Sequence, residues 1–365
     1  MTAATRFRGD AMMRIFAVMA VLVLVCLSIA ASADVFNLGM GYTNLETVFV
    51  GDTGNVGELS GPGGGGYYPA RICGSVGYNY NIGKYEVTTK QYTDFLNAKA
   101  KSDPYGLYNS AMADTTNNSQ GCNIKRTGTS GDYSYTVGNG SQTDITNWAN
   151  RPVNFVSYWD SLRFANWLGN GQGNGSTETG AYTLNGCTGY DGRTIQRNAG
   201  ATWAVTSEDE WYKAAYYKGG NTNAGYWLYP TKSNTAPTNQ VLSTDPGNSA
   251  NYYINSYSIG GPYYRTNVGE FENSASAYGT FDQGGNVYEW NEAIVYQDEN
   301  HACRGLRGCS FNGSSTLQAS FRSGDYPSFE YSGIGFRVSQ VPEPSSIIAL
   351  AGGLISLLGI RRRRA

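Results

Sequence analysis

The chain has 365 residues, with 26 basic and 28 acidic side chains, 48 glycines, 29 tyrosines and one histidine. Seven of the arginines and two of the acids lie near the two ends, so the part between them holds 19 basic and 26 acidic residues. This composition excludes the basic surface that nucleic-acid binding needs, and one histidine excludes a site built from several imidazoles.

The first 33 residues have the pattern of a secretory signal peptide. Arg6, Arg8 and Arg14 precede an apolar run over 15–29, and the small residues 31–33 predict cleavage before Asp34. An uncleaved anchor helix is the alternative, although the apolar run is short for a membrane span. We therefore predict a signal peptide over 1–33, one domain over 34–340 and a C-terminal tail over 341–365.

Three helices are predicted by capping boxes that precede apolar residues at helical spacing. The boxes are Thr88 with Gln91, Ser157 with Asp160, and Ser207 with Glu210. The third helix begins with acids at 208–210. We interpret them as stabilising the positive end of the helix dipole rather than as catalytic groups. We expect the core to take up the tryptophans Trp159, Trp167, Trp203, Trp211 and Trp290.

Short strands in long loops are predicted for the rest of the domain. The candidates are 48–50, 76–82, 191–195, 226–229, 287–290, 308–311 and 335–338, and the stretches 102–147 and 169–176 read as insertions or lids. Few helices combined with many short strands indicate the α+β class.

Five cysteines follow the predicted signal peptide, and export permits disulfides. They are Cys73, Cys122, Cys187, Cys303 and Cys309. We expect one disulfide between Cys122 and Cys187, and a second, local disulfide between Cys303 and Cys309. The odd number leaves at least one thiol free or intermolecular.

A glycine turn within 279–290 is a candidate metal site. Gly284 and Gly285 allow a tight turn, and Asp282 and Glu289 place a carboxylate on either side of it. Carboxylates together with free backbone carbonyls are the oxygen donors that Ca²⁺ prefers. The alternative is a plain turn followed by an edge strand with solvated acids.

Six motifs in order over residues 70–340 resemble the formylglycine-generating-enzyme family, also called sulfatase-modifying-factor domains. They are 84–88 (KYEVT), 151–157 (RPVNFVS), 205–211 (VTSEDEW), 284–290 (GGNVYEW), 307–311 (RGCSF) and 335–338 (GFRV). The resemblance implies an α+β fold of the C-type-lectin-like variety, with few helices, short strands and long loops. Fold alone does not decide activity.

The resemblance also implies two structural calcium ions. One would be held by the side chains of Asp282 and Glu289 and the carbonyls of Gly285 and Val287. For the other, Asn251 and the Tyr252 carbonyl match the family pattern, and the usual aspartate falls near Gly260. We expect Arg337 to be a buried structural arginine paired with an acid.

The family's reaction needs two cysteines that bind copper, and their positions here are Gly313 and Gln318. Copper(I) prefers thiolate ligands, which neither residue supplies, so copper is not expected. The iron-dependent branch of the family uses three histidines, whereas this chain has only His301, which we place in a polar surface loop. Cys303 and Cys309 remain as candidate catalytic thiols, which would bind the metal at a different position from the family's cysteines.

The C-terminal tail resembles the PEP-CTERM sorting tag of Gram-negative bacteria. A Val-Pro-Glu-Pro sequence at 341–344 precedes an apolar stretch over 347–360 and four arginines at 361–364. The resemblance implies recognition by an exosortase, cleavage near 342–344, and transient membrane contact before release to the envelope or extracellular matrix. A plain membrane anchor is the alternative, with an apolar stretch short for a bilayer.

Three functions are compatible with these features. The first is a non-catalytic binding module at the cell surface or in the matrix, which contacts glycan or protein through tyrosine and amide groups. The second is an oxidase of the family type with atypical metal ligands. The third is a maturation partner that binds an unfolded sulfatase peptide without oxidising it.

Overall fold

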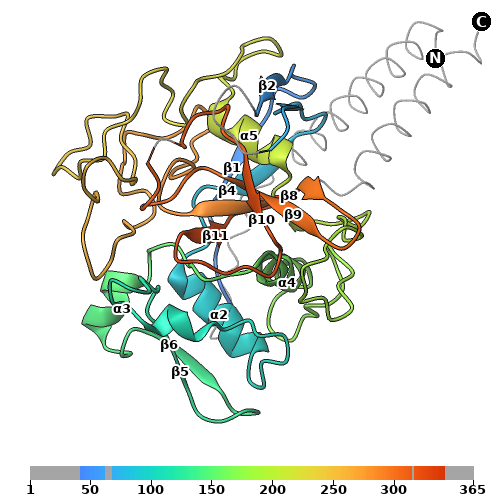
Figure 1. Cartoon of the computed structure of the whole chain (residues 1–365), viewed down its shortest axis with the longest axis vertical. Coiled ribbons are helices and arrows are strands. Elements are labelled where there is room, and N and C mark those ends of the chain that lie inside the picture. Colours follow the sequence, from blue (N-terminus) through green and yellow to red (C-terminus); the bar gives the residue numbers. More distant parts are fainter. Residues whose placement is uncertain (1–41, 62–67, 315, 342–365) are drawn as a thin grey trace, which may run out of the picture. The chain divides into compact units, whose positions relative to one another are not determined.

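A computed structural model describes residues 42–61, 68–314 and 316–341 of the chain (Figure 1). The predicted signal peptide and nearly all of the predicted sorting tag lie outside these residues. None of the helices in the described residues is long and apolar enough to cross a membrane.

The three predicted helices form, and each begins at its predicted cap. They are α2 (Thr89–Lys99), α4 (Tyr158–Gly169) and α5 (Glu208–Tyr216), capped by Thr88, Ser157 and Ser207. Each cap is a complete capping box, in which cap and third helical residue satisfy each other's backbone N–H groups. Helix α5 ends at Tyr216, three residues before the glycine pair at 219–220.

Two four-stranded sheets form the centre of the fold (Figure 1). The first has the order β1 (Thr47–Val50), β4 (Tyr80–Gly83), β12 (Val338–Gln340), β7 (Trp203–Val205) and is antiparallel. The second has the order β10 (Ser323–Asp325), β9 (Ala302–Arg307), β8 (Tyr288–Gln297), β11 (Ile334–Phe336), with β11 parallel to β8. Arg337 lies between β11 and β12, so the chain passes from one sheet to the other at this residue.

Two hairpins complete the described strands. One joins β2 (Glu58–Ser60) to β3 (Arg71–Cys73), and the other joins β5 (Ile124–Thr127) to β6 (Ser134–Val137). The second hairpin lies in the predicted insertion 102–147, together with the 3₁₀ helix η1 (Ser110–Ala113) and α3 (Gln142–Trp148). The insertion is therefore a folded part of the domain.

The core is aromatic, and all five tryptophans predicted for it are buried. Helix α4 is buried over almost its whole length, so its polar residues need internal partners. Asn166 shows how they find them, because its amide donates to the Thr177 and Tyr182 carbonyls and accepts from the Tyr182 N–H. The predicted class, α+β with few helices, short strands and long loops, is confirmed.

Three strand predictions are wrong. Residues 191–195 are a loop, because the Gly192 and Ile195 carbonyls accept from the Arg304 side chain where a strand partner would have donated. Residues 226–229 make only isolated bridges, and 308–311 leave the sheet after β9 has ended. In each case the backbone groups that were expected to form hydrogen bonds within a β-sheet bond to side chains or within turns instead.

The predicted disulfides are also wrong, since all five cysteines of the described residues are free thiols. Cys303 lies inside the extended strand β9 and Cys309 beyond its end, and an extended chain rises about 3.3 Å per residue. The strand carries the two thiols apart, and they have different neighbours. Cys122 is buried beside Arg265, whereas Cys187 lies near Arg163 and Glu178.

A thiol count tests this arrangement directly. Denatured protein, alkylated without reductant and measured by intact mass, is expected to carry five alkyl groups when it is purified without its first 33 residues. Four of the five thiols are buried, so native protein should react mainly at Cys187. Detection of only three or one alkyl groups in the denatured sample would contradict the free-thiol arrangement.

Candidate functional site

Arg337 and Glu289 form a fully buried ion pair beneath the glycine turn. The Arg337 Nε and Nη2 atoms donate to the two Glu289 carboxylate oxygens, both at 2.9 Å, and Trp211 Nε1 donates to Oε2 at 2.7 Å. The remaining Arg337 hydrogen bonds go to the carbonyls of Gly83 and Phe281. The prediction of a buried structural arginine paired with an acid is confirmed.

Two further carboxyl groups lie close to this pair but accept few hydrogen bonds. Both oxygens of Glu86, from the first motif, are buried and have no hydrogen-bond partner in the described residues. Burial, with the charges of Asp282 and Glu289, raises the pKa of Glu86 well above its usual value. Asp282 accepts one hydrogen bond, from the Gly269 N–H at 2.6 Å, and burial raises its pKa to about 6.

The chemistry around the turn fits a calcium ion. When ionised, Glu86, Asp282 and Glu289 carry three negative charges against the single positive charge of Arg337, which leaves an excess equal to one divalent cation. A small polar cavity of about 10 Å³, the size of one water molecule, adjoins Asp282, but Gly285, Val287 and Glu289 do not line it. Within the described residues, no three Asp, Glu, His or Cys side chains could hold a metal on their own. Calcium would therefore need carbonyls such as those of Gly285 and Val287.

Two observations qualify the ligand sets that were predicted. Both Glu289 oxygens already accept from Arg337 and Trp211, so a calcium ion would have to share this carboxylate. In the second set, Asn251 Oδ1 is buried and accepts no hydrogen bond in the described residues, which leaves it available as a ligand. The Tyr252 carbonyl, by contrast, accepts from Asn239 and Ser258.

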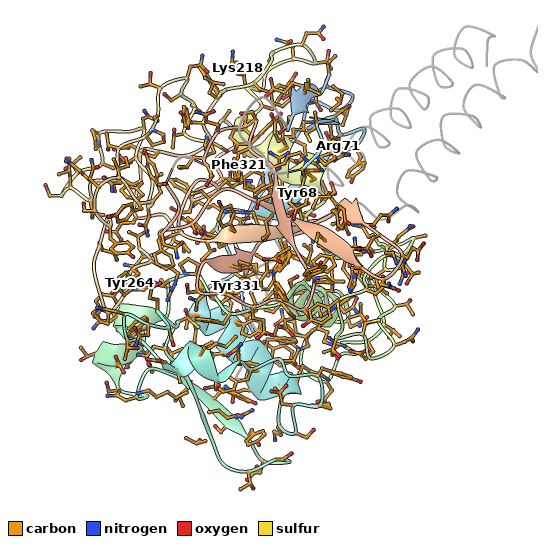
Figure 2. All side chains as sticks on the ribbon, in the orientation of Figure 1. Tyr68, Arg71, Lys218, Tyr264, Phe321 and Tyr331 are labelled. Carbon is orange, nitrogen blue, oxygen red and sulfur yellow. The ribbon has the colours of Figure 1, made fainter. Side chains whose placement is uncertain are left out.

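Glu208 is the centre of a buried charge network that the sequence did not predict. Its carboxylate accepts from the guanidinium groups of Arg307, Arg322 and Arg71, with distances of 2.7 to 3.0 Å. Figure 2 shows Arg71 and Phe321 in the same part of the molecule, and the Phe321 carbonyl accepts from Arg307. Burial alone would raise the pKa of Glu208, but Arg307 and Arg322 hold it at about 2.

One of the two positions that hold the family's cysteines, Gly313, lies beside Cys309. A Cβ atom on Gly313 would come within 2.5 Å of Cys309 Sγ, so a side chain there would overlap the sulfur unless Cys309 turned away. Cys309 has a φ of 72°, the left-handed backbone conformation that favours glycine. Burial raises the pKa of its thiol. Gln318 carries no sulfur and donates to the Tyr229 hydroxyl at 3.1 Å.

A groove of about 740 Å³ opens next to these positions. Among the described residues, none that lines the groove is charged, and three are tyrosines. The lining residues are Tyr229, Ala236, Pro237, Tyr252, Tyr253, Ile254, Asn255, Ser314, Leu317 and Gln318. We call this set the tyrosine groove. Leu317, Tyr229 and Tyr252 also pack in one buried cluster with Cys309, so the thiol lies behind the groove wall.

The other candidate residues do not join this site. Cys303 lies on β9 near Tyr68 and Asp325, among different neighbours from those of Cys309. His301 is in the loop between β8 and β9, partly exposed, with its ring bonded to Asp298, as predicted for a surface histidine.

The chain belongs to the sulfatase-modifying-factor family, because the model of the sulfatase-modifying factor enzyme 1-like domain matches residues 74–341. The PEP-CTERM protein-sorting motif matches residues 340–364, and the resemblance predicted for the tail is confirmed. No protein among curated sequences matches the chain.

Several solved structures are similar to the chain over most of its length. CarF is 20% identical over 82% of this chain and 98% of its own, with a TM-score of 0.48. Variable protein 1 of Treponema denticola is 16% identical over 84% and 98% of the two chains, with a TM-score of 0.46. PvdO from Pseudomonas aeruginosa is 19% identical over 82% and 95%, with a TM-score of 0.45.

Proposed function

We propose that this protein is an exported, non-catalytic binding module that holds its ligand in the tyrosine groove. The observation that supports it is the replacement of the family's copper-binding cysteines by Gly313 and Gln318 beside a groove that is still open. Uncharged, aromatic walls with a few amide and hydroxyl groups suit a neutral glycan or an extended stretch of an extracellular protein.

The sorting tag supplies the second part of the proposal. The family match at 340–364 indicates an exported protein recognised by exosortase machinery. We propose that the signal peptide over 1–33 directs export, that the tag anchors the chain transiently in the membrane, and that cleavage near 342–344 releases the domain. The domain would then act at the envelope or in the extracellular matrix.

Loss of catalysis can be tested with a peptide that contains the Cys-x-Pro-x-Arg sequence of sulfatases. The purified protein, loaded with copper and supplied with oxygen and reductant, is expected to form no aldehyde by mass spectrometry. A triple variant with Cys309→Gly, Gly313→Cys and Gln318→Cys restores the family pattern and removes the predicted overlap at position 313. We expect this variant to bind copper(I), which provides the matched control.

Aldehyde formation by the unmodified protein would overturn the proposal and favour the oxidase with atypical ligands. Variants with Cys303→Ser and Cys309→Ser would then show which thiol is responsible. Saturable binding of the unoxidised sulfatase peptide, without aldehyde, would instead favour the maturation partner.

Ligand binding can be tested by replacing one wall of the groove. Tyr253 is partly exposed, so Tyr253→Ala should leave folding intact while removing an aromatic contact. We expect about a 5- to 150-fold loss of affinity for envelope or matrix glycan fractions in isothermal titration, since a lost aromatic interface contact costs about 1–3 kcal/mol. Tyr190→Ala, at a comparably exposed tyrosine outside the groove, is the control, and equal effects from both would contradict the assignment.

A further inference from the structure

A network of aromatic side chains forms a second surface of the domain. Its members come from three connections of the fold: the one between α4 and β7, the turn between β8 and β9, and the segment between β10 and β11. They are Tyr190, His301, Tyr326, Phe329 and Tyr331, the last of them labelled in Figure 2. We call this set the aromatic patch. None of its residues lines the tyrosine groove.

The rings of the aromatic patch meet edge to face and remain open to solvent. The ring centre of Tyr190 lies 5.5 Å from that of Tyr326 and 5.8 Å from that of Phe329. Phe329 continues the network to Tyr331, at 5.6 Å. Tyr190 and Tyr331 are 52% and 49% exposed, although burial of an aromatic ring is favourable. Contiguous exposed aromatic surface of this kind is typical of a binding face.

Acidic side chains accompany the exposed rings. Asp298 Oδ1 lies 3.2 Å from the ring nitrogen Nδ1 of His301, and the Asp298 side chain is 40% exposed. Asp325 directly precedes a ring of the aromatic patch, and within the described residues neither acid forms an ion pair with a lysine or an arginine. Arg193, which lies nearby, is already paired with Asp191 at 2.8 Å. The two acids therefore leave negative charge beside the rings.

We propose that the aromatic patch binds an arginine- or lysine-rich segment of another extracellular polypeptide. The face of an aromatic ring carries the negative part of its quadrupole and attracts a cation, and the carboxylates of Asp298 and Asp325 attract the same charge. The part of the chain between its two ends holds 26 acidic and 19 basic residues, so the overall field also favours a basic partner.

Charge distinguishes this partner from the other occupants of such a surface. A neutral glycan would gain nothing from the two carboxylates, and an anionic polymer would be repelled by them. A second copy of this chain would bring the same acids to the contact. The inference is independent of the ligand in the tyrosine groove, because the two surfaces share no residue.

Titration of a fluorescein-labelled octaarginine peptide, followed by fluorescence anisotropy, tests the aromatic patch. We expect saturable binding at low salt that weakens at physiological salt, because counterions screen exposed charges. Tyr190→Ala and Tyr331→Ala should each weaken it about two- to fivefold, the contribution of one exposed cation–π contact. Both residues are about half exposed, so the variants should fold normally. Tyr190→Phe keeps the ring and should bind as the wild type does.

The contribution of charge is measured with a double variant, Asp298→Asn with Asp325→Asn. The amide oxygens can still accept the backbone hydrogen bonds of these residues, so only the charge is lost. We expect weaker peptide binding and a smaller dependence on salt. Asp132→Asn with Glu272→Gln makes the same change of charge at two exposed acids elsewhere in the domain and is the matched control.

Equal affinity for an octaglutamate peptide would overturn the inference, and so would octaarginine binding that Tyr190→Ala and Tyr331→Ala both leave intact. Self-association in sedimentation velocity that Tyr190→Ala abolishes would overturn it too, because a second copy would then cover the aromatic patch. Loss of glycan binding in Tyr190→Ala would assign the surface to a sugar instead. Tyr253→Ala in the tyrosine groove should leave peptide binding unchanged, so failure here and failure of the groove assignment are separable.

Discussion

Replacement of Glu208 by glutamine is expected to lower the free energy of unfolding by about 3–5 kcal/mol, the usual cost of removing one partner of a buried ion pair. The side chains of Glu208, Arg307 and Arg322 are 1%, 1% and 4% exposed. Without the carboxylate, two buried guanidiniums lose their counter-charge while staying shielded from water. Urea denaturation followed by tryptophan fluorescence measures the change.

Asp209→Asn is the matched control, because Asp209 is the next residue along α5 and also contacts Arg71. Its side chain is 25% exposed and that of Arg71 is 41% exposed, so water screens the interaction. Exposed pairs contribute about 0.2–1 kcal/mol, and the control should fall in that range. Equal losses in the two variants would show that burial of the network does not determine its contribution.

The Glu208 contribution should also depend on pH. In the folded protein the neighbouring arginines lower the pKa of Glu208 to about 2, from the usual 4.5. Stability from this group is therefore fully present above about pH 4.5 and is lost as the pH falls through about 2. The difference between wild type and Glu208→Gln should shrink over the same interval, and a difference that stays constant down to pH 2 would contradict the assignment.

Calcium is expected to stabilise the protein strongly at pH 7.5 and weakly at pH 5. Burial raises the folded-state pKa of Asp282 to about 6 from the usual 3.8, and burial also raises the pKa of Glu86 well above its usual value. Without a cation, the stability gained from the neutral Asp282 carboxyl is complete below about pH 3.8 and is lost as the pH rises through about 6. Calcium would compensate the charges that form at higher pH. At 100 times its dissociation constant the gain is about 2.7 kcal/mol.

Thermal unfolding with calcium and with a chelator, at both pH values, measures this coupling. Asp282→Asn removes a buried charge, so we expect it to raise the stability of calcium-free protein at pH 7.5 and to abolish the calcium response. Glu270→Gln changes an exposed acid close to Asp282 and should keep the response. A calcium effect of equal size at both pH values, or one that survives Asp282→Asn, would show that the ion does not bind at the glycine turn.

Local sequence determined the features that depend on neighbouring residues. The capping boxes at Thr88, Ser157 and Ser207 gave the starts of α2, α4 and α5, because a cap needs only a residue pair three positions apart. The spacing of apolar residues along each helix also predicted that the tryptophans are buried, because this pattern too depends only on residues a few positions apart. The ordered motifs and the C-terminal tail identified the family and the sorting motif, and the absence of sulfur at positions 313 and 318 is directly readable in the chain.

Tertiary structure alone decided which distant groups meet. Two partners of Glu208 are 99 and 114 residues further along the chain and the third is 137 residues before it, and no local pattern specifies such pairs. Cys309 lies in the space next to Gly313 only because the chain turns back after β9. The prediction of a disulfide between Cys303 and Cys309 failed because sequence spacing ignores the direction of an extended strand. Local interactions set where elements begin, whereas long-range packing sets which side chains share a buried site.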